Sequence, residues 1–122
     1  NVLSESIYSI CDTLILILGI ITTCSIFIVI VDNILNINSN FKFIYGLLEI
    51  STGVNYLSFF DCSSLVKILT STFFISFGGL SIHFQIFSIL NNKKIRYIPY
   101  FFTRIINGIL SSLITLLLIQ IN

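Results

Sequence analysis

The sequence predicts an all-α membrane protein with about four transmembrane segments, one or two of them discontinuous or re-entrant. Hydrophobic residues make up 56% of the 122 residues and charged residues only 9%, whereas soluble domains carry about a quarter charged residues. The apolar residues lie in runs of about 20 residues or more, the length that crosses a bilayer. Residues 76–90, inside one of these runs, contain Gly78-Gly79, His83 and Gln85. Such a segment is tolerated at membrane depth only where it is buried in protein or lines a cavity.

Composition excludes several other classes. The net charge of +1 gives no electrostatic basis for binding nucleic acid. The three cysteines, Cys11, Cys24 and Cys62, have no spacing suited to zinc, so we expect small buried hydrophobes, no metal and no cofactor. The chain contains no methionine and begins NVLSESIYSI, without the basic region or cleavage site of a signal peptide. We therefore expect a single membrane domain, residues 1–122, that forms part of a longer protein.

The first predicted span is residues 7–31, in which Asp12 is the only charged residue. Small and polar side chains share one side of this helix, which is typical of a helix–helix contact: Ser9, Asp12, Gly19, Thr22 and Thr23. Asp12 lies near the end of the span and is expected to reach the interface. A polar connector, residues 32–42, follows.

The second predicted span, residues 41–60, carries Glu49 near its middle, on the helix face that also holds Gly46 and Gly53. An ionised carboxylate at the bilayer centre costs about 2.5–3.5 kcal/mol on insertion scales. Glu49 should therefore face a cavity or a partner, with an unwound turn beside it formed by neighbouring small residues: Ser51, Thr52 and Gly53. Two alternatives remain open, an interfacial segment with Glu49 reaching the membrane surface, or a salt bridge to Arg104.

The third predicted span, residues 65–90, has a polar stripe at helical spacing: Ser71, Gly78, Ser81, Gln85 and Ser88. The Gly78-Gly79 pair predicts a break, because each glycine weakens a helix by roughly 1 kcal/mol. Two half-helices would then present their termini to a solute or ion, as in many secondary transporters. For His83, on the other side of the helix, we expect an interhelical hydrogen bond.

Residues 91–98 include Lys93, Lys94 and Arg96, and short basic loops stay cytoplasmic. Pro99 then starts the last predicted span, residues 100–121, with a second small and polar stripe: Arg104, Asn107, Gly108, Ser111 and Thr115. Arg104 could reach the interface or pair with Glu49. Four crossings place both chain ends on the non-cytoplasmic side; a re-entrant hairpin at residues 41–60 would reduce the count to three.

Three blocks carry a family resemblance: FIYGLLEISTG (43–53), FISFGGLSIHFQIFSIL (74–90) and IRYIPYFFTRIINGI (95–109). Together they resemble the C-terminal half of the YlbJ-like sporulation integral membrane proteins, within the wider group that has nucleoside-recognition, or Gate, domains. The resemblance implies a protein of the outer forespore membrane that moves dipicolinic acid towards the developing spore. It also implies that an earlier Gate-like half is missing from this chain.

Two functions are therefore weighed. The first is a transporter of dipicolinic acid or another small solute, such as a nucleoside, with a candidate solute or ion site at Glu49, Ser51, Thr52, Gly53, Gly78, Gly79, Ser81 and Gln85. His83, Arg104 and Asn107 are assigned structural or pairing roles. The second is a non-transporting assembly or scaffold protein, in which the same stripes only pack helices.

No catalytic motif is present, so an enzyme is not expected. Expected partners are the bilayer, the missing half, a small anionic solute and, as an open alternative, a second copy.

Overall fold

The computed structural model describes residues 2–91 and 96–121, and all regular structure in these ranges is helical. The elements, in chain order, are α1 Val2–Leu35, the 3-10 helix η1 Ser39–Leu47, α2 Ile50–Phe59, α3 Ser64–Phe77, α4 Gly79–Asn91 and α5 Tyr97–Ile121. The predicted all-α class is therefore confirmed for the described part of the chain.

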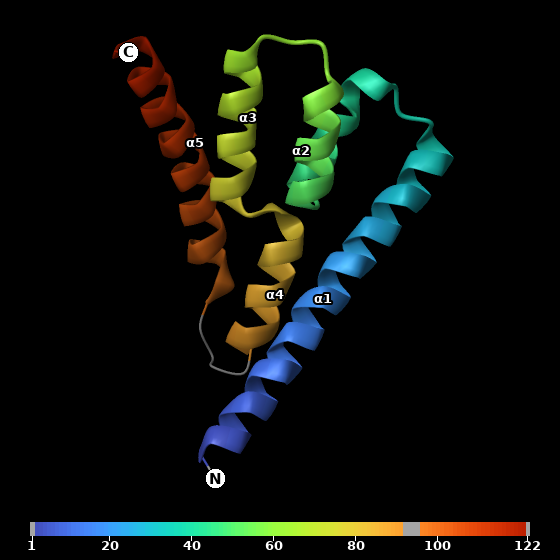
Figure 1. The fold of residues 1–122 in the computed structure, drawn as a ribbon, viewed down its shortest axis with the longest axis vertical. Coiled ribbons are helices and arrows are strands. Elements are labelled where there is room, and N and C mark those ends of the chain that lie inside the picture. The colour runs from blue at the N-terminus through green and yellow to red at the C-terminus, as the bar shows by residue number, and fades with distance from the viewer. Residues whose placement is uncertain (1, 92–95, 122) are drawn as a thin grey trace.

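Within these ranges, three segments are long and apolar enough to cross a membrane: α1, the α3–α4 pair (Ser64–Leu90) and α5. Figure 1 shows them running along the long axis of the molecule, with α1 inclined across the others. α1 is longer than the expected span of residues 7–31. The second predicted span, residues 41–60, does not form one helix. It is divided between η1 and α2, each too short to cross alone.

Instead, η1 and α2 form a helical hairpin that returns to the end of the molecule from which it started (Figure 1). Two glycines allow this close approach, since a Cβ on Gly53 would overlap the backbone of Gly46. The rings of Phe43 and Phe60 close the open end, with 5.4 Å between their centroids. The first described turn of α1 and the last of α5 lie at opposite ends of the molecule (Figure 1). The expectation that both ends share one side is wrong.

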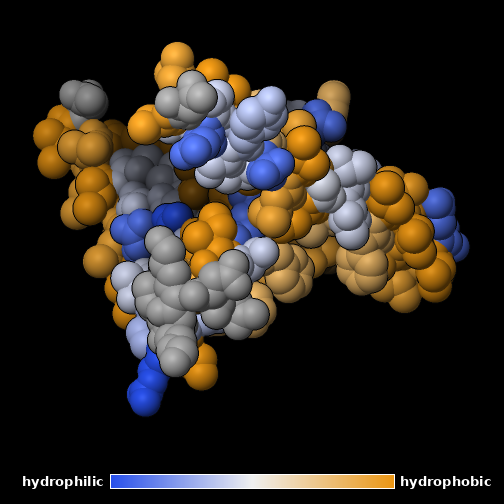
Figure 2. Space-filling view, turned by 90° about the horizontal axis from the view of Figure 1, so that it is seen from below, coloured by the Kyte–Doolittle hydropathy of each residue, from blue (hydrophilic) through white to orange (hydrophobic). Residues whose placement is uncertain are grey.

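Close contacts between small residues and aromatic rings hold the helices together. Gly108 of α5 packs against the ring of Phe73 in α3, and the Ser112 hydroxyl donates a hydrogen bond to the Leu69 carbonyl, 3.1 Å away. Gly46 of the hairpin packs against the ring of Phe74. Most other large apolar side chains are exposed. Figure 2 shows the molecule from below, with orange apolar side chains over much of its outline and polar side chains in smaller areas. An apolar outer surface is what contact with lipid requires.

Candidate solute site at two helix breaks

The first break lies between η1 and α2, where Glu49 is the N-cap of α2 with extended backbone. Its carboxylate accepts hydrogen bonds from the Ser51 N–H (3.0 Å), the Thr52 N–H (2.7 Å) and the Thr52 hydroxyl (2.7 Å). A helix N-terminus favours such an anion because its first N–H groups lack partners within the helix. Glu49 is only 5% exposed, so the cap compensates a buried charge.

Glu49 is therefore committed to its own helix, and the alternative of a salt bridge to Arg104 is wrong. The Arg104 guanidinium instead donates from Nε to the Tyr100 hydroxyl (2.7 Å) and from Nη1 to the Ser76 carbonyl (3.2 Å). In the described ranges the salt bridge formed is between Lys42 and Asp32. Both ends of the expected pair have other partners.

The second break separates α3 from α4, as the glycine pair predicts. Gly78 caps α3 with φ +99° and donates its N–H to the Phe74 carbonyl, 2.9 Å away. Gly79 has φ +59°. Residues with a Cβ rarely adopt this left-handed backbone conformation, so the two glycines permit the turn. The third span is thus two half-helices in succession.

The two breaks contact each other in the middle of the molecule. The Ser81 N–H, in the first turn of α4, donates to the Leu48 carbonyl in the hairpin break, 2.9 Å away. A Cβ on Gly79 would lie 3.3 Å from the carbonyl oxygens of Gly46 and Leu48. The N-terminus of α4 thus lies against carbonyl groups of the η1–α2 break. The hydrogen bond between Ser81 and Leu48 pairs an N–H and a carbonyl that have no partner within their own helices.

Most predicted site residues gather at this meeting point. Glu49, Gly53, Gly78, Gly79 and Ser81 are all buried. Gln85 follows one turn later in α4 and is 9% exposed, yet its side chain makes no hydrogen bond to other described residues. Ser51 has an exposed side chain, and Asn107 is exposed on α5. These last two do not join the buried group.

His83 makes the expected interhelical contact: its Nδ1 lies 2.6 Å from the Tyr97 hydroxyl of α5. The ring is 2% exposed and packs against three further rings at centroid distances of 4.7–5.7 Å, those of Phe77, Tyr100 and Phe101. Its other nitrogen, Nε2, is buried and has no hydrogen-bond partner in the described chain. Sequence pattern alone does not reveal this unpaired atom, because it depends on how four aromatic rings pack.

Replacing Tyr97 with phenylalanine should destabilise the α4–α5 contact by about 1 kcal/mol, the net value of one hydrogen bond. The phenyl ring keeps the packing but leaves Nδ1 of His83 without its partner. Thermal unfolding in detergent, followed by circular dichroism, measures the loss. The matched control is Tyr8→Phe, since Tyr8 is 73% exposed on α1. Equal stability of the two variants would contradict the assignment.

A separate polar contact joins the end of α1 to the hairpin, and the sequence analysis missed it. Asp32 accepts hydrogen bonds from the Lys42 ammonium (2.6 Å) and the Tyr45 hydroxyl (3.1 Å). The hydrogen bond to Asp32 raises the pKa of Lys42 above its ordinary value. Asp32 and Lys42 lie in the predicted polar connector and Tyr45 lies just beyond it, so no helical periodicity links the three residues.

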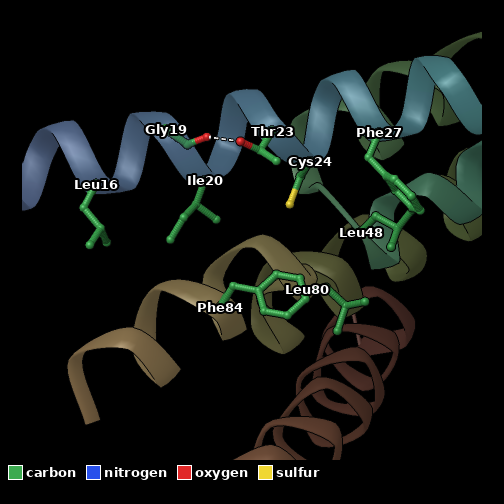
Figure 3. Close-up of a pocket in the computed structure, with 9 residues that line it drawn as sticks. All are labelled: Leu16, Gly19, Ile20, Thr23, Cys24, Phe27, Leu48, Leu80 and Phe84. Atoms are coloured by element: carbon green, nitrogen blue, oxygen red, sulfur yellow. Dashed lines mark hydrogen bonds between the residues drawn. The ribbon is translucent and has the colours of Figure 1, made fainter. Parts of the chain in front are cut away.

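An apolar groove of about 670 Å³ lies between α1 and α4. Figure 3 shows Leu16, Ile20 and Phe27 of α1 opposite Leu80 and Phe84 of α4, and the Thr23 hydroxyl turned back to the Gly19 carbonyl. The hydroxyl is thus satisfied within its own helix. With no charged side chain in its lining, this groove is not a site for an anionic solute.

No family model matches the sequence, and no solved structure matches it. Over 73 residues, however, the chain is 33% identical to the sporulation integral membrane protein YlbJ of Bacillus subtilis (strain 168). The expected resemblance is confirmed. The match covers 60% of this chain but only 18% of YlbJ, so the chain spans less than a fifth of that relative's length. The similarity to YlbJ and the three apolar helices together indicate an integral membrane protein.

Proposed function

We propose that this chain is part of a sporulation transporter that carries dipicolinic acid across the outer forespore membrane towards the developing spore. The observation that carries this proposal is the contact between two interrupted helical segments, made by the Ser81 N–H and the Leu48 carbonyl. Secondary transporters commonly bind their solutes near the bilayer midplane, where discontinuous helices expose helix ends and backbone groups. The proposed activity is binding and translocation, without covalent chemistry.

The proposed membrane arrangement has three crossings and one re-entrant hairpin. The hairpin η1–α2 enters from the end of the molecule that carries the α2–α3 connection and returns to it (Figure 1). The end of α4 and the start of α5, which flank the predicted basic loop of residues 91–98, lie at the opposite end, together with the first turns of α1 (Figure 1). Lys93 and Lys94 of this loop lie outside the described residues, and Arg96 is exposed. By the positive-inside rule this end faces the mother-cell cytoplasm.

The proposal includes a longer protein, because the similarity to YlbJ covers 18% of that relative. An N-terminal half with its own interrupted segments would complete the site against α4 and the hairpin. Gln85 is the side chain that supports this arrangement: the residue is 9% exposed and makes no hydrogen bond to other described residues, and its amide atoms are not fully buried. Its amide is free to bind the solute.

Replacing Gln85 with leucine, which is similar in size, should reduce dipicolinate loading of spores about tenfold or more, the effect of losing a hydrogen bond to a charged group. Protein abundance and thermal stability should not fall, because Gln85 has no hydrogen bond to another described residue to lose. The full-length gene is expressed in a sporulating host without its own copy, and dipicolinate is measured in purified spores and in the mother-cell fraction.

The matched control is Gln120→Leu, the same substitution at an exposed position near the end of α5, which should load spores normally. Normal loading by the Gln85 variant would remove Gln85 from the site. A parallel fall in abundance and loading would instead favour an assembly or scaffold protein. If the wild-type gene does not restore dipicolinate loading, the proposed substrate is wrong.

A further inference from the structure

Arg104, the eighth residue of the 25-residue helix α5, reaches the middle of the neighbouring Ser64–Leu90 span. Its Nη1 donates to the carbonyl of Ser76, which is the 13th of the 27 residues of the Ser64–Leu90 span. Its Nε donates to the hydroxyl of Tyr100, 2.7 Å away, and the guanidinium carbon lies 5.4 Å from the Tyr100 ring centroid. These contacts hold the guanidinium plane at the level of the α3–α4 break.

None of the chain's five acidic residues neutralises this charge. Asp32 pairs with Lys42, and Glu49 caps α2. Glu5 and Asp12 lie in the exposed first half of α1, and Asp61 precedes α3, at the opposite end of that helix from Ser76. All five are among the described residues, so this cation has only neutral oxygen partners in this chain. A buried or membrane-embedded charge without an opposite charge is unfavourable.

The guanidinium also has unused hydrogen-bond donors. Its fork carries further N–H groups on Nη1 and Nη2 beyond the two in use, and Arg104 is only partly buried. Next to it, His83 packs its ring 5.7 Å from that of Tyr100 and has Nε2 buried without a partner. The Arg104 guanidinium thus has N–H groups that the described residues leave unpaired, next to a buried imidazole.

We propose that Arg104 binds a carboxylate of the transported solute at the α3–α4 break. This inference rests on the proposed transport function and assigns to Arg104 the recognition of the anion. A guanidinium matches a carboxylate through two parallel N–H···O bonds, which a lysine ammonium cannot reproduce. The bound anion neutralises the charge at mid-membrane, so the loaded site is more favourable in the bilayer than the empty one.

The test is a binding titration on the full-length protein in lipid nanodiscs, followed by tyrosine fluorescence and by the ligand-induced rise in melting temperature. The probes are pyridine-2,6-dicarboxylate, benzoate and the uncharged benzamide. We expect both carboxylates to bind and benzamide not to bind. Arg104→Lys should weaken carboxylate binding about tenfold or more, and Arg104→Gln should abolish saturable binding.

The control is Lys67→Gln, which removes the same charge from α3 at a site whose ammonium contacts the Ser58 carbonyl; it should bind carboxylates within about twofold of wild type. Should Arg104→Gln fail to fold, Arg104→Lys decides. Equal dicarboxylate binding by wild type and the Arg104 variants would overturn the role of Arg104 and leave the transport proposal standing. Arg104-dependent binding of benzoate but not of the dicarboxylate would keep the site and remove dipicolinate as substrate. No carboxylate binding by the wild type would overturn the inference.

Discussion

Replacing Gly53 with alanine is expected to open the η1–α2 hairpin and to destabilise the protein by about 3 kcal/mol, at the upper end of overpacking costs. The added methyl group would overlap the Cα and N atoms of Gly46. Backbone atoms cannot move aside as a flexible side chain does, so the two segments must separate. The contact of Ser81 with Leu48 would be lost with them. Chemical denaturation in detergent, followed by circular dichroism, measures the change.

Gly19→Ala is the matched control, since a Cβ there meets nothing within 4 Å. Both positions are helical, so each substitution gains the same propensity of about 1 kcal/mol, and only the Gly53 variant introduces an overlap. Gly19→Ala should be as stable as the wild type or more stable. If the two variants unfold alike, the close packing of the hairpin is not what stabilises the molecule.

Replacing Glu49 with alanine should cost about 2–4 kcal/mol, because it removes an N-cap and leaves three partly buried donors unpaired. The Thr52 N–H and hydroxyl and the Ser51 N–H all lose their acceptor. The first turn of α2 should then fray, and amide hydrogen exchange at Ser51 and Thr52 should accelerate. Exchange measured by mass spectrometry, together with the unfolding free energy, tests both effects.

Asn55→Ala is the control for this helix, since Asn55 is exposed in α2; it should change stability by less than about 0.5 kcal/mol. A Glu49 variant that is as stable as the wild type would show that the carboxylate does not serve as a cap. Such a result would favour the alternative that Glu49 belongs to a solute or ion site.

The sequence predicts where the helices break, but it does not predict the partners of the charged residues. Gly78-Gly79 marks a break through local backbone preference, and the structure has positive φ at both residues. For Glu49, hydropathy shows only that a carboxylate exposed to lipid is unfavourable. Whether it pairs with Arg104 or caps α2 depends on the backbone turn at residues 48–50, which the helical pattern of residues 41–60 conceals.

The sequence by itself determined the class of this protein: all-helical, membrane-integral, with an interrupted third span. These properties follow from residue composition, run length and glycine placement, all of which act locally along the chain. The fold-back of residues 41–60 emerges only from packing in three dimensions. So does the position of Arg104, which contacts the Ser76 carbonyl and forms no salt bridge with a described acidic residue. The tertiary structure also brought the two breaks together, because contacts between residues about 30 positions apart, such as Leu48 and Ser81, depend on packing that no periodicity encodes.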